Sequence, residues 1–344
     1  MLIVDDSLVI RHLLKVALEE APDIEVVGSE ASGLTALERI PELKPDVITL
    51  DIEMPGIDGL ETLRRIRKQY PRMRTIMFST LTTRGASATF EALSLGADDY
   101  VAKAANAGSL DKSLESLRGE LIPRIRQFFR SSTAPAAPPR MVAGIAPAGG
   151  RRASAVKVIG IGVSTGGPQA LGELMPRLPA NLPAGVLIVQ HMPPMFTRLL
   201  AERLNACCPL EVMEAGEGLE IKPGRAIVAR GDYHLRVRRS GESYVAALDQ
   251  GPQENSCRPA ADVLFRSLAQ SYGAGVLSVV LTGMGQDGLG GVRDLHAAGA
   301  FCLAQDEASS VVWGMPGAVA QAGLADRVVP LAQMAPEIVR RAMG

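Results

Sequence analysis

Cysteine, net charge and long apolar runs are all scarce in this chain. Its 344 residues hold four cysteines, with no CxxC spacing and no secretory signal before them. This usage excludes a disulfide scaffold and predicts reduced thiols in a cytoplasmic protein. Lys and Arg total 36 against 37 Asp and Glu, so there is no electrostatic reason to expect a nucleic acid partner or a membrane surface. The longest apolar runs have strand length, well short of the roughly 20 residues of a transmembrane helix, so we expect no membrane insertion.

A segment with almost no large apolar side chains divides the chain. Residues 131–155 are rich in Ala, Pro, Gly and Ser. Such a composition cannot bury enough surface to offset the entropy of ordering, so it predicts a semi-flexible linker, with a structured coil as the alternative. We predict a first domain over residues 1–120, a helical extension and linker over 121–154, and a second domain over 155–344.

Both halves alternate strand-like and helix-like segments. In the first half, runs such as DVITLD and TIMFST are separated by stretches with apolar residues three and four apart. This alternation predicts an α/β fold, in which a parallel sheet is covered by helices on both faces. The second half repeats the pattern with VKVIGIG, GVLIVQH and GVLSVVLTG. Residues 225–249 alternate in strand fashion around two turn signals, which predicts inserted antiparallel hairpins.

Acidic residues gather at the strand ends of the first half. Asp5 and Asp6 follow the first strand, and Asp51 ends the third. Because the carboxyl ends of parallel strands meet at one edge, these carboxylates should converge, and a hard cation such as Mg²⁺ relieves their repulsion. An aspartate in such a site can also accept a phosphoryl group. The alternative is that the aspartates merely cap a helix or open a turn.

Residues 1 to about 120 resemble the receiver domain of bacterial response regulators, through LIVDDS, DVITLDIEMPGIDGLE, TIMFSTLT and GADDYVAK. The resemblance implies a flavodoxin-like five-stranded sheet with Asp51 as the phospho-acceptor. It implies Mg²⁺ at Asp6, Asp51 and the carbonyl of Glu53, with Asp5 acting through water. It also implies three switch residues: Ser79, Tyr100 and Lys103. Two features depart from the pattern: Ala104 replaces the usual proline, and the first strand is so short that we expect the natural start to lie upstream.

The glycine-rich stretch VIGIGVSTGGPQALGEL begins at Val158 and raises the question of a phosphate-binding loop or a nucleophile. The pattern G-x-G-x-x-G fails because its third position falls on Thr165, and no GK[ST] follows. The pattern G-x-S-x-G is satisfied by Gly162, Ser164 and Gly166, between a strand and a helix. This is the setting of an exposed nucleophilic serine, which needs a base and an orienting acid.

Few histidines compete for the role of base, since the chain has four. His191 directly follows the strand GVLIVQ and is expected at the same sheet edge as Ser164. Asp287, in LTGMGQDG after another strand, is the expected acid. The order Ser164, His191, Asp287 differs from that of α/β-hydrolases and disfavours that superfamily. The remaining histidines are expected to be structural, with His234 the better functional candidate among them: His12, His234 and His296.

From about residue 155 onward, the chain resembles the catalytic domain of the chemotaxis protein-glutamate methylesterase family, CheB. The motifs are IGVSTGGP, VQHMPPMFT, RPAADVLF, LTGMGQDG and QDEASSVVWGMPGAV. The resemblance implies Ser164 as nucleophile, His191 as base and then acid, and Asp287 as the orienting carboxylate, without a cofactor. Backbone N–H groups at Thr165 and near Met284 are the expected oxyanion donors. Cys257 stands where the family usually has histidine, and Arg230 where proline is common.

The two resemblances together predict a phosphorylation-activated serine esterase. It would hydrolyse glutamate γ-methyl esters on methyl-accepting chemotaxis receptors and deamidate receptor glutamines, with a histidine kinase as phosphodonor for Asp51. By analogy with the family, the unphosphorylated receiver would cover the Ser164 cleft. The alternatives are a non-catalytic phosphoryl sink or scaffold, and the same enzyme in a receptor array other than flagellar chemotaxis.

Overall fold

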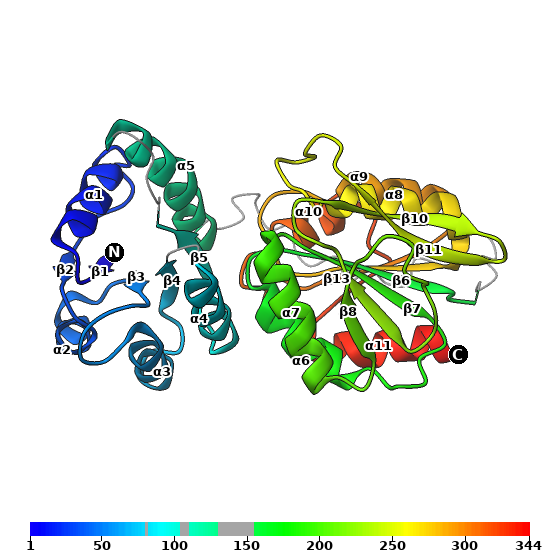
Figure 1. Cartoon of the computed structure of the whole chain (residues 1–344), viewed down its shortest axis with the longest axis horizontal. Helices are drawn as coiled ribbons and strands as arrows, with labels where there is room; N and C mark the ends of the chain where they lie inside the picture. Colours follow the sequence, from blue (N-terminus) through cyan, green and yellow to red (C-terminus); the bar gives the residue numbers. More distant parts are fainter. Residues whose placement is uncertain (80–81, 104–109, 130–154) are drawn as a thin grey trace. The chain divides into compact units, whose positions relative to one another are not determined.

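The computed structural model describes residues 1–79, 82–103, 110–129 and 155–344 (Figure 1). The predicted linker and Ala104 lie outside the described residues. Contacts divide the chain into two compact units, Met1–Arg130 and Ser131–Gly344. Each unit is described by itself.

The first unit is a five-stranded parallel sheet between two helical layers, as predicted (Figure 1). Helices α1 and α5 cover one face, and α2, α3 and α4 cover the other. The strands, in the spatial order β2-β1-β3-β4-β5, are β1 (Leu2–Val4), β2 (Gly28–Glu30), β3 (Val47–Asp51), β4 (Arg74–Ser79) and β5 (Asp99–Ala102). The helices are α1 (Leu8–Glu19), α2 (Gly33–Leu43), α3 (Gly59–Gln69), α4 (Thr83–Ser94) and α5 (Leu110–Phe129).

Local sequence signals explain where these helices begin. Ser7, Ser32, Asp58 and Thr82 are the N-caps of the first four helices, and each side chain accepts a backbone N–H three residues further on. The apolar strand residues are buried on both faces, with Ile3, Ile76 and Phe78 packed against the apolar stripes of α1 and α5. This double burial is why the strands appear in the sequence as continuous apolar runs.

The second unit contains a seven-stranded sheet in which every neighbouring pair is parallel. Helices α8, α9 and α10 lie on one face and α6, α7 and α11 on the other (Figure 1). The strands, in the order β14-β13-β12-β6-β7-β9-β8, are β6 (Val158–Val163), β7 (Gly185–Gln190), β8 (Glu211–Glu214), β9 (Arg225–Val228), β12 (Val276–Val280), β13 (Phe301–Gln305) and β14 (Arg327–Val329). The helices are α6 (Gly167–Leu174), α7 (Pro194–Cys207), α8 (Ala261–Tyr272), α9 (Leu289–Ala297), α10 (Met315–Gln321) and α11 (Leu331–Met343).

The region 225–249 corrects one prediction. Its first strand, β9, joins the main sheet in parallel between β7 and β8 instead of forming a hairpin. The physical reason is burial on both faces, since Ala226, Ile227 and Val228 are almost fully covered. The remainder forms a single antiparallel hairpin of β10 (His234–Ser240) and β11 (Ser243–Asp249), which packs against α8 through a 2.6 Å hydrogen bond from the Val237 N–H to Ser267 Oγ.

Strands β12, β6 and β7 are neighbours at the middle of the second sheet. Ser164 directly follows β6, His191 directly follows β7, and Asp287 lies in the loop after β12. The topology therefore brings the three predicted residues to one sheet edge, where ligands of parallel sheets bind. Among the described helices, none combines the length and apolar character needed to cross a bilayer.

Candidate functional sites

The acidic cluster of the first unit forms as predicted. Carboxylate oxygens of Asp5, Asp6 and Asp51 lie within 4.8 Å of one another, with Asp5 and Asp51 buried and Asp6 exposed. Asp5 also accepts the N–H of Ser7 at 2.9 Å, so its side chain is fixed at the start of α1. The cluster lies at the carboxyl ends of β1 and β3, which are paired in the sheet.

Lys103 supplies the positive charge of this cluster. Its Nζ lies 2.9 Å from Asp5 Oδ2 and 2.7 Å from Asp51 Oδ2. Burial raises the pKa of Asp51 to about 6, and Asp5 adds to the rise while Lys103 opposes it. Burial lowers the pKa of Lys103, but its hydrogen bonds to Asp51 and Asp5 outweigh burial and raise it. The ammonium is therefore charged and neutralises only part of the negative charge of the cluster.

The donor set fits a hard divalent cation. The two oxygens that face Lys103, on Asp5 and Asp51, are buried and make no hydrogen bond besides the ion pairs to the ammonium. Three carboxylates at this spacing match the oxygen ligands of Mg²⁺. The Glu53 N–H donates to Asp51 Oδ1 at 3.3 Å, so the Glu53 backbone lies beside the cluster. The role of the Glu53 carbonyl as a ligand stays a prediction.

The predicted switch residues lie on β4, on β5 and directly after β5. Ser79 ends β4, and its buried hydroxyl donates to the Gly85 carbonyl of α4 at 3.3 Å. The Lys103 N–H donates to the Ser79 carbonyl at 2.7 Å, which couples the two residues. Tyr100 lies on β5, with the Arg124 guanidinium 6.0 Å from its ring centre. Ser79 thus contacts α4 and Tyr100 lies beside Arg124 of α5, and the switching roles of Ser79, Tyr100 and Lys103 stay predictions.

The loop after β6 presents Ser164. Its N–H donates to the Thr282 carbonyl at 3.0 Å, and the loop after β12 packs directly against it. Gly166, and not Ser164, takes the left-handed conformation of this loop, with φ 76°. A methyl group at Gly166 would fall 2.6 Å from Val311, so both conformation and space require glycine there.

His191 and Asp287 form a buried hydrogen-bonded pair. The distance from His191 Nε2 to Asp287 Oδ2 is 2.7 Å, and the His191 N–H donates at 3.3 Å to Val163, the residue before Ser164. Burial raises the pKa of Asp287, but the imidazole and backbone N–H groups outweigh it and hold that pKa below its usual value. Burial lowers the pKa of His191, and its bonds to Asp287 and Cys257 reverse that effect and raise it. With Nε2–H directed to the carboxylate, Nδ1 is the nitrogen left to take a proton.

The two predicted oxyanion donors lie on the loops after β6 and β12. Thr165 is buried at the start of α6, and its carbonyl accepts the hydroxyl of Thr282 at 2.9 Å. Met284 lies on the loop after β12 with a side chain that is 43% exposed. Thr282, on the loop after β12, thus also contacts the loop after β13, because its Oγ1 accepts the Val312 N–H at 3.0 Å. Donation to an oxyanion stays a prediction for both residues.

Two residues that sequence reasoning did not single out contact this site. Buried Gln190 donates through Nε2 to the Ser164 carbonyl at 2.9 Å. Asn255 donates through Nδ2 to Asp287 Oδ1 at 3.0 Å. Gln190 stands within the motif VQHMPPMFT, which offered a signal, whereas Asn255 precedes the motif RPAADVLF and offered none.

The remaining histidines occupy positions outside the pair. His12 is an exposed residue of α1 and His296 lies on α9. His234 is buried, and its Nε2 lies 2.9 Å from the Pro252 carbonyl. Among the four histidines, His191 is the one bonded to a carboxylate at the sheet edge of Ser164.

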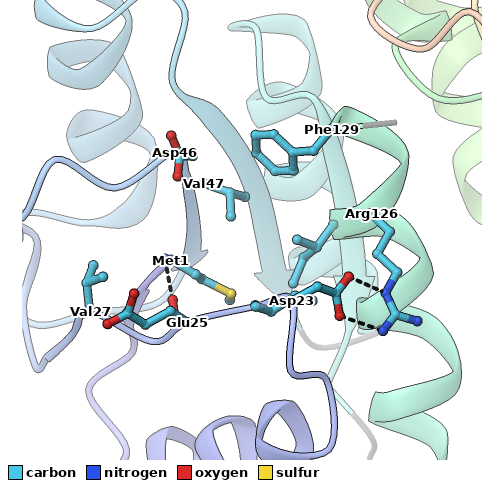
Figure 2. A pocket seen from close by; sticks show the side chains of 10 residues that line it. Met1, Asp23, Glu25, Val27, Asp46, Val47, Arg126 and Phe129 are labelled. Atoms are coloured by element: carbon cyan, nitrogen blue, oxygen red, sulfur yellow. Dashed lines mark hydrogen bonds and ion pairs between the residues drawn. The ribbon is translucent and has the colours of Figure 1, made fainter. Parts of the chain in front are cut away.

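A cavity of about 570 Å³ opens at the amino end of the first sheet (Figure 2). Met1, Asp46 and Val47 line it from the strand starts, and Arg126 of α5 donates to both oxygens of Asp23 at its rim. The acidic cluster lies at the other end of the same strands. No residue of that cluster is among the described residues that line this cavity.

Comparisons with known proteins find relatives of both units. Residues 1–115 match the model of the response regulator receiver domain, and residues 159–338 match that of the CheB methylesterase. A protein-glutamate methylesterase/protein-glutamine glutaminase of Trichodesmium erythraeum is 50% identical over 99% of this chain and 98% of its own length. One of Nocardioides sp. is 50% identical over 99% of this chain and 94% of its own length. The Thermotoga maritima CheB methylesterase catalytic domain aligns with a TM-score of 0.53 and 39% identity, over 54% of this chain and 99% of that chain.

A receiver domain in front of an α/β unit with serine, histidine and aspartate at adjacent strand ends defines a class, the response regulators with an enzymatic output domain. Within that class, the chain belongs to the CheB methylesterase family.

Proposed function

We propose that this chain is a phosphorylation-activated serine esterase. Its substrates would be glutamate γ-methyl esters on methyl-accepting chemotaxis receptors, and it would also deamidate receptor glutamines. The observation that carries the proposal is the 2.7 Å His191–Asp287 pair at the strand end next to Ser164. The names of relatives that match nearly the whole chain support the choice of substrate.

In this proposal each residue takes one step. Ser164 Oγ attacks the ester carbonyl while His191 Nδ1 takes its proton, and Asp287 stabilises the resulting imidazolium through Nε2. His191 then protonates the leaving oxygen, so methanol departs and an acyl-enzyme remains. Water, deprotonated by His191, attacks the acyl group and restores Ser164 and a free glutamate. From a glutamine the leaving group is ammonia, and the other steps are the same.

In this proposal, backbone N–H groups stabilise the oxyanion. The N–H groups of Thr165, which follows Ser164, and of Met284, which follows Gly283, would donate to the developing charge. Because α6 begins at Gly167, its positive end would add to this stabilisation.

The first unit would control the second through Asp51. A histidine kinase would supply the phosphoryl group, and Mg²⁺ held by Asp5, Asp6, Asp51 and the Glu53 carbonyl would neutralise its charge. Lys103, which contacts Asp5 and Asp51, would pair with the new phosphoryl oxygens. Ser79 and Tyr100 would then respond to the phosphoryl group by altering their contacts with α4 and α5, which would shift the population toward an active state. The protein would act in the cytoplasm.

Methanol release tests this function. Methylated receptor membranes are incubated with the wild type, Ser164→Ala and Asp51→Asn, each with and without Mg²⁺ and a small phosphodonor. We expect release by the wild type to rise with phosphodonor, to be lost in Ser164→Ala, and to stay at the basal rate in Asp51→Asn. Release that persists in Ser164→Ala would show that Ser164 is not the nucleophile. A normal phosphodonor response in Asp51→Asn would show that Asp51 does not control the activity.

A further inference from the structure

A tight turn before α8 places the side-chain amide of Asn255 against the carboxylate of Asp287, the partner of His191. The turn, at residues 254–257, is closed by two backbone hydrogen bonds between Glu254 and Cys257, of 3.1 and 2.9 Å. Its two central residues, Asn255 and Ser256, have φ values of 51° and 60°. Asparagine tolerates this left-handed conformation better than most residues, which makes it suited to this position.

Asn255 bridges two carboxylates. Its Nδ2 lies 3.0 Å from Asp287 Oδ1 and 2.9 Å from Asp262 Oδ2. An amide nitrogen has two hydrogens, so it can donate to both carboxylates at once. Asp262 is fixed in turn, because its Oδ1 accepts the Gly291 N–H at 2.6 Å.

The other donors to Asp287, apart from His191, belong to the backbone. The carboxylate accepts N–H groups from Ala261 at 2.6 Å and from Asp262 and Gly288 at 3.0 Å each. His191 and Asn255 are thus the side-chain donors, one to each carboxylate oxygen. Asn255 therefore limits rotation of the carboxylate that orients the imidazole.

The charged neighbours of this bridge include Asp262 and Arg266 of α8, Glu254 of the turn and the His191–Asp287 pair, with Asp294 of α9 acting on Arg266. Burial raises the pKa of Asp262. Glu254 is neutralised by its bidentate contact with Arg266 of α8. The Cys257 side chain adds to the rise in the pKa of His191. The amide of Asn255 is a neutral donor between two acidic groups.

We propose that Asn255 is a positioning residue for the reaction. It holds the Asp287 carboxylate so that His191 keeps Nε2–H on the carboxylate and Nδ1 available to Ser164, and it separates Asp287 from Asp262 without adding charge. The inference rests on the esterase function proposed above and adds a fourth side chain to its machinery.

Two substitutions at Asn255 distinguish the effect of its hydrogen-bond donation from the effect of an added charge. Asn255→Gly keeps the left-handed backbone and removes the amide, and we expect kcat to fall about 10- to 100-fold with KM little changed, because the amide nitrogen is engaged by Asp287 and Asp262. Asn255→Asp keeps the shape, removes the donor and adds a charge beside Asp287. We expect the pKa of His191 to rise, so the acid limb of kcat/KM moves to higher pH.

Ser256→Asp is the matched control, because it puts the same charge on the exposed neighbouring residue of the turn. We expect it to leave kcat and the acid limb unchanged. The His191 titration is followed by NMR in every variant, which reads the imidazole without turnover. Wild-type kinetics in Asn255→Gly, or an equal upward shift of the His191 pKa in Ser256→Asp and Asn255→Asp, would overturn the inference. An inactive wild type would instead overturn the esterase function, while the NMR shift still tests Asn255.

Discussion

Asp51 is a buried carboxylate whose ionised form opposes folding of its own unit. Burial and the neighbouring Asp5 raise its pKa to about 6 from 3.8, and Lys103 offsets only part of that effect. A group whose folded pKa is raised binds a proton more tightly in the folded state. Its contribution to stability is therefore favourable below pH 4, is lost as pH rises through about 6, and stays constant above that.

Asp51→Asn should consequently stabilise the first unit at pH 7.5, by about 1–2 kcal/mol, and have little effect at pH 4. Urea unfolding followed by circular dichroism at both pH values measures the difference. The single tryptophan, Trp313, lies in the second unit and reports that unit separately by fluorescence. The same stabilisation at both pH values would contradict the electrostatic origin.

His191 sets the pH dependence of the proposed reaction. Its neutral form is the base, and Asp287 raises the pKa of the imidazole above the ordinary 6.5. The neutral fraction therefore grows with pH through that raised pKa, and kcat/KM should still be rising above pH 7. In Asp287→Asn the acid limb should move to lower pH while the plateau of kcat falls by roughly 10³- to 10⁴-fold. A pH profile of methanol release measures both, and an unmoved acid limb would contradict the role of Asp287.

At the scale of elements, the site depends on close contact between the loops after β6 and β12. Gly283 allows that contact, because an added methyl group would fall 2.5 Å from Met315 Sδ and 2.8 Å from Ser164 Cβ. The two loops cannot move apart freely, because the Thr282 hydroxyl bonds to the carbonyls of Thr165 and Val312.

Gly283→Ala should therefore displace Ser164 and lower kcat about 100-fold. The matched control is Gly172→Ala within α6, where no atom lies within 4 Å of the added methyl group. That substitution should leave kcat unchanged and stabilise the second unit by about 0.5–1 kcal/mol, because alanine favours a helix over glycine. Methanol release and Trp313 fluorescence in urea measure the two effects. Full activity of Gly283→Ala would show that the loop spacing is not critical.

At the scale of the whole molecule, two units with separate sheets should respond separately to Mg²⁺ in the absence of a phosphodonor. Mg²⁺ has its fitting donor set in the first unit, at the acidic cluster. At about 10 to 100 times its dissociation constant, a bound ion should stabilise that unit by about 1.4–2.7 kcal/mol.

Mg²⁺ should thus raise the urea midpoint seen by circular dichroism for the first unit and leave the Trp313 transition in place. Chelation should reverse the effect, and Asp6→Asn should abolish most of it, because Asp6 is the exposed member of the cluster. The ion series is run on the full chain with Ca²⁺ as a comparison. A shift of the Trp313 transition by Mg²⁺ in Asp6→Asn would place the ion elsewhere.

Much of this protein follows from the sequence alone. Apolar runs alternating with amphipathic segments dictate parallel sheets, because strands buried on both faces need apolar side chains at every position. Asp51, Ser164 and His191 could be located because each lies at the end of such a run, and strand ends share an edge. The sequence predicts a helical extension from residue 121, and the structure has one helix, α5, over Leu110–Phe129.

Other features were decided only by tertiary structure. Strand β9 looks like half of a hairpin, and its place in the main sheet depends on burial between β7 and β8. Asn255 has no motif of its own, and its bond to Asp287 joins residues 32 positions apart through packing of the turn against the loop after β12. The raised pKa of Asp51 likewise depends on burial and on Lys103, which lies on a strand end two positions away in the sheet. Local pattern determines which segments become strands and helices, whereas contacts between distant segments determine the charge and orientation of the groups that react.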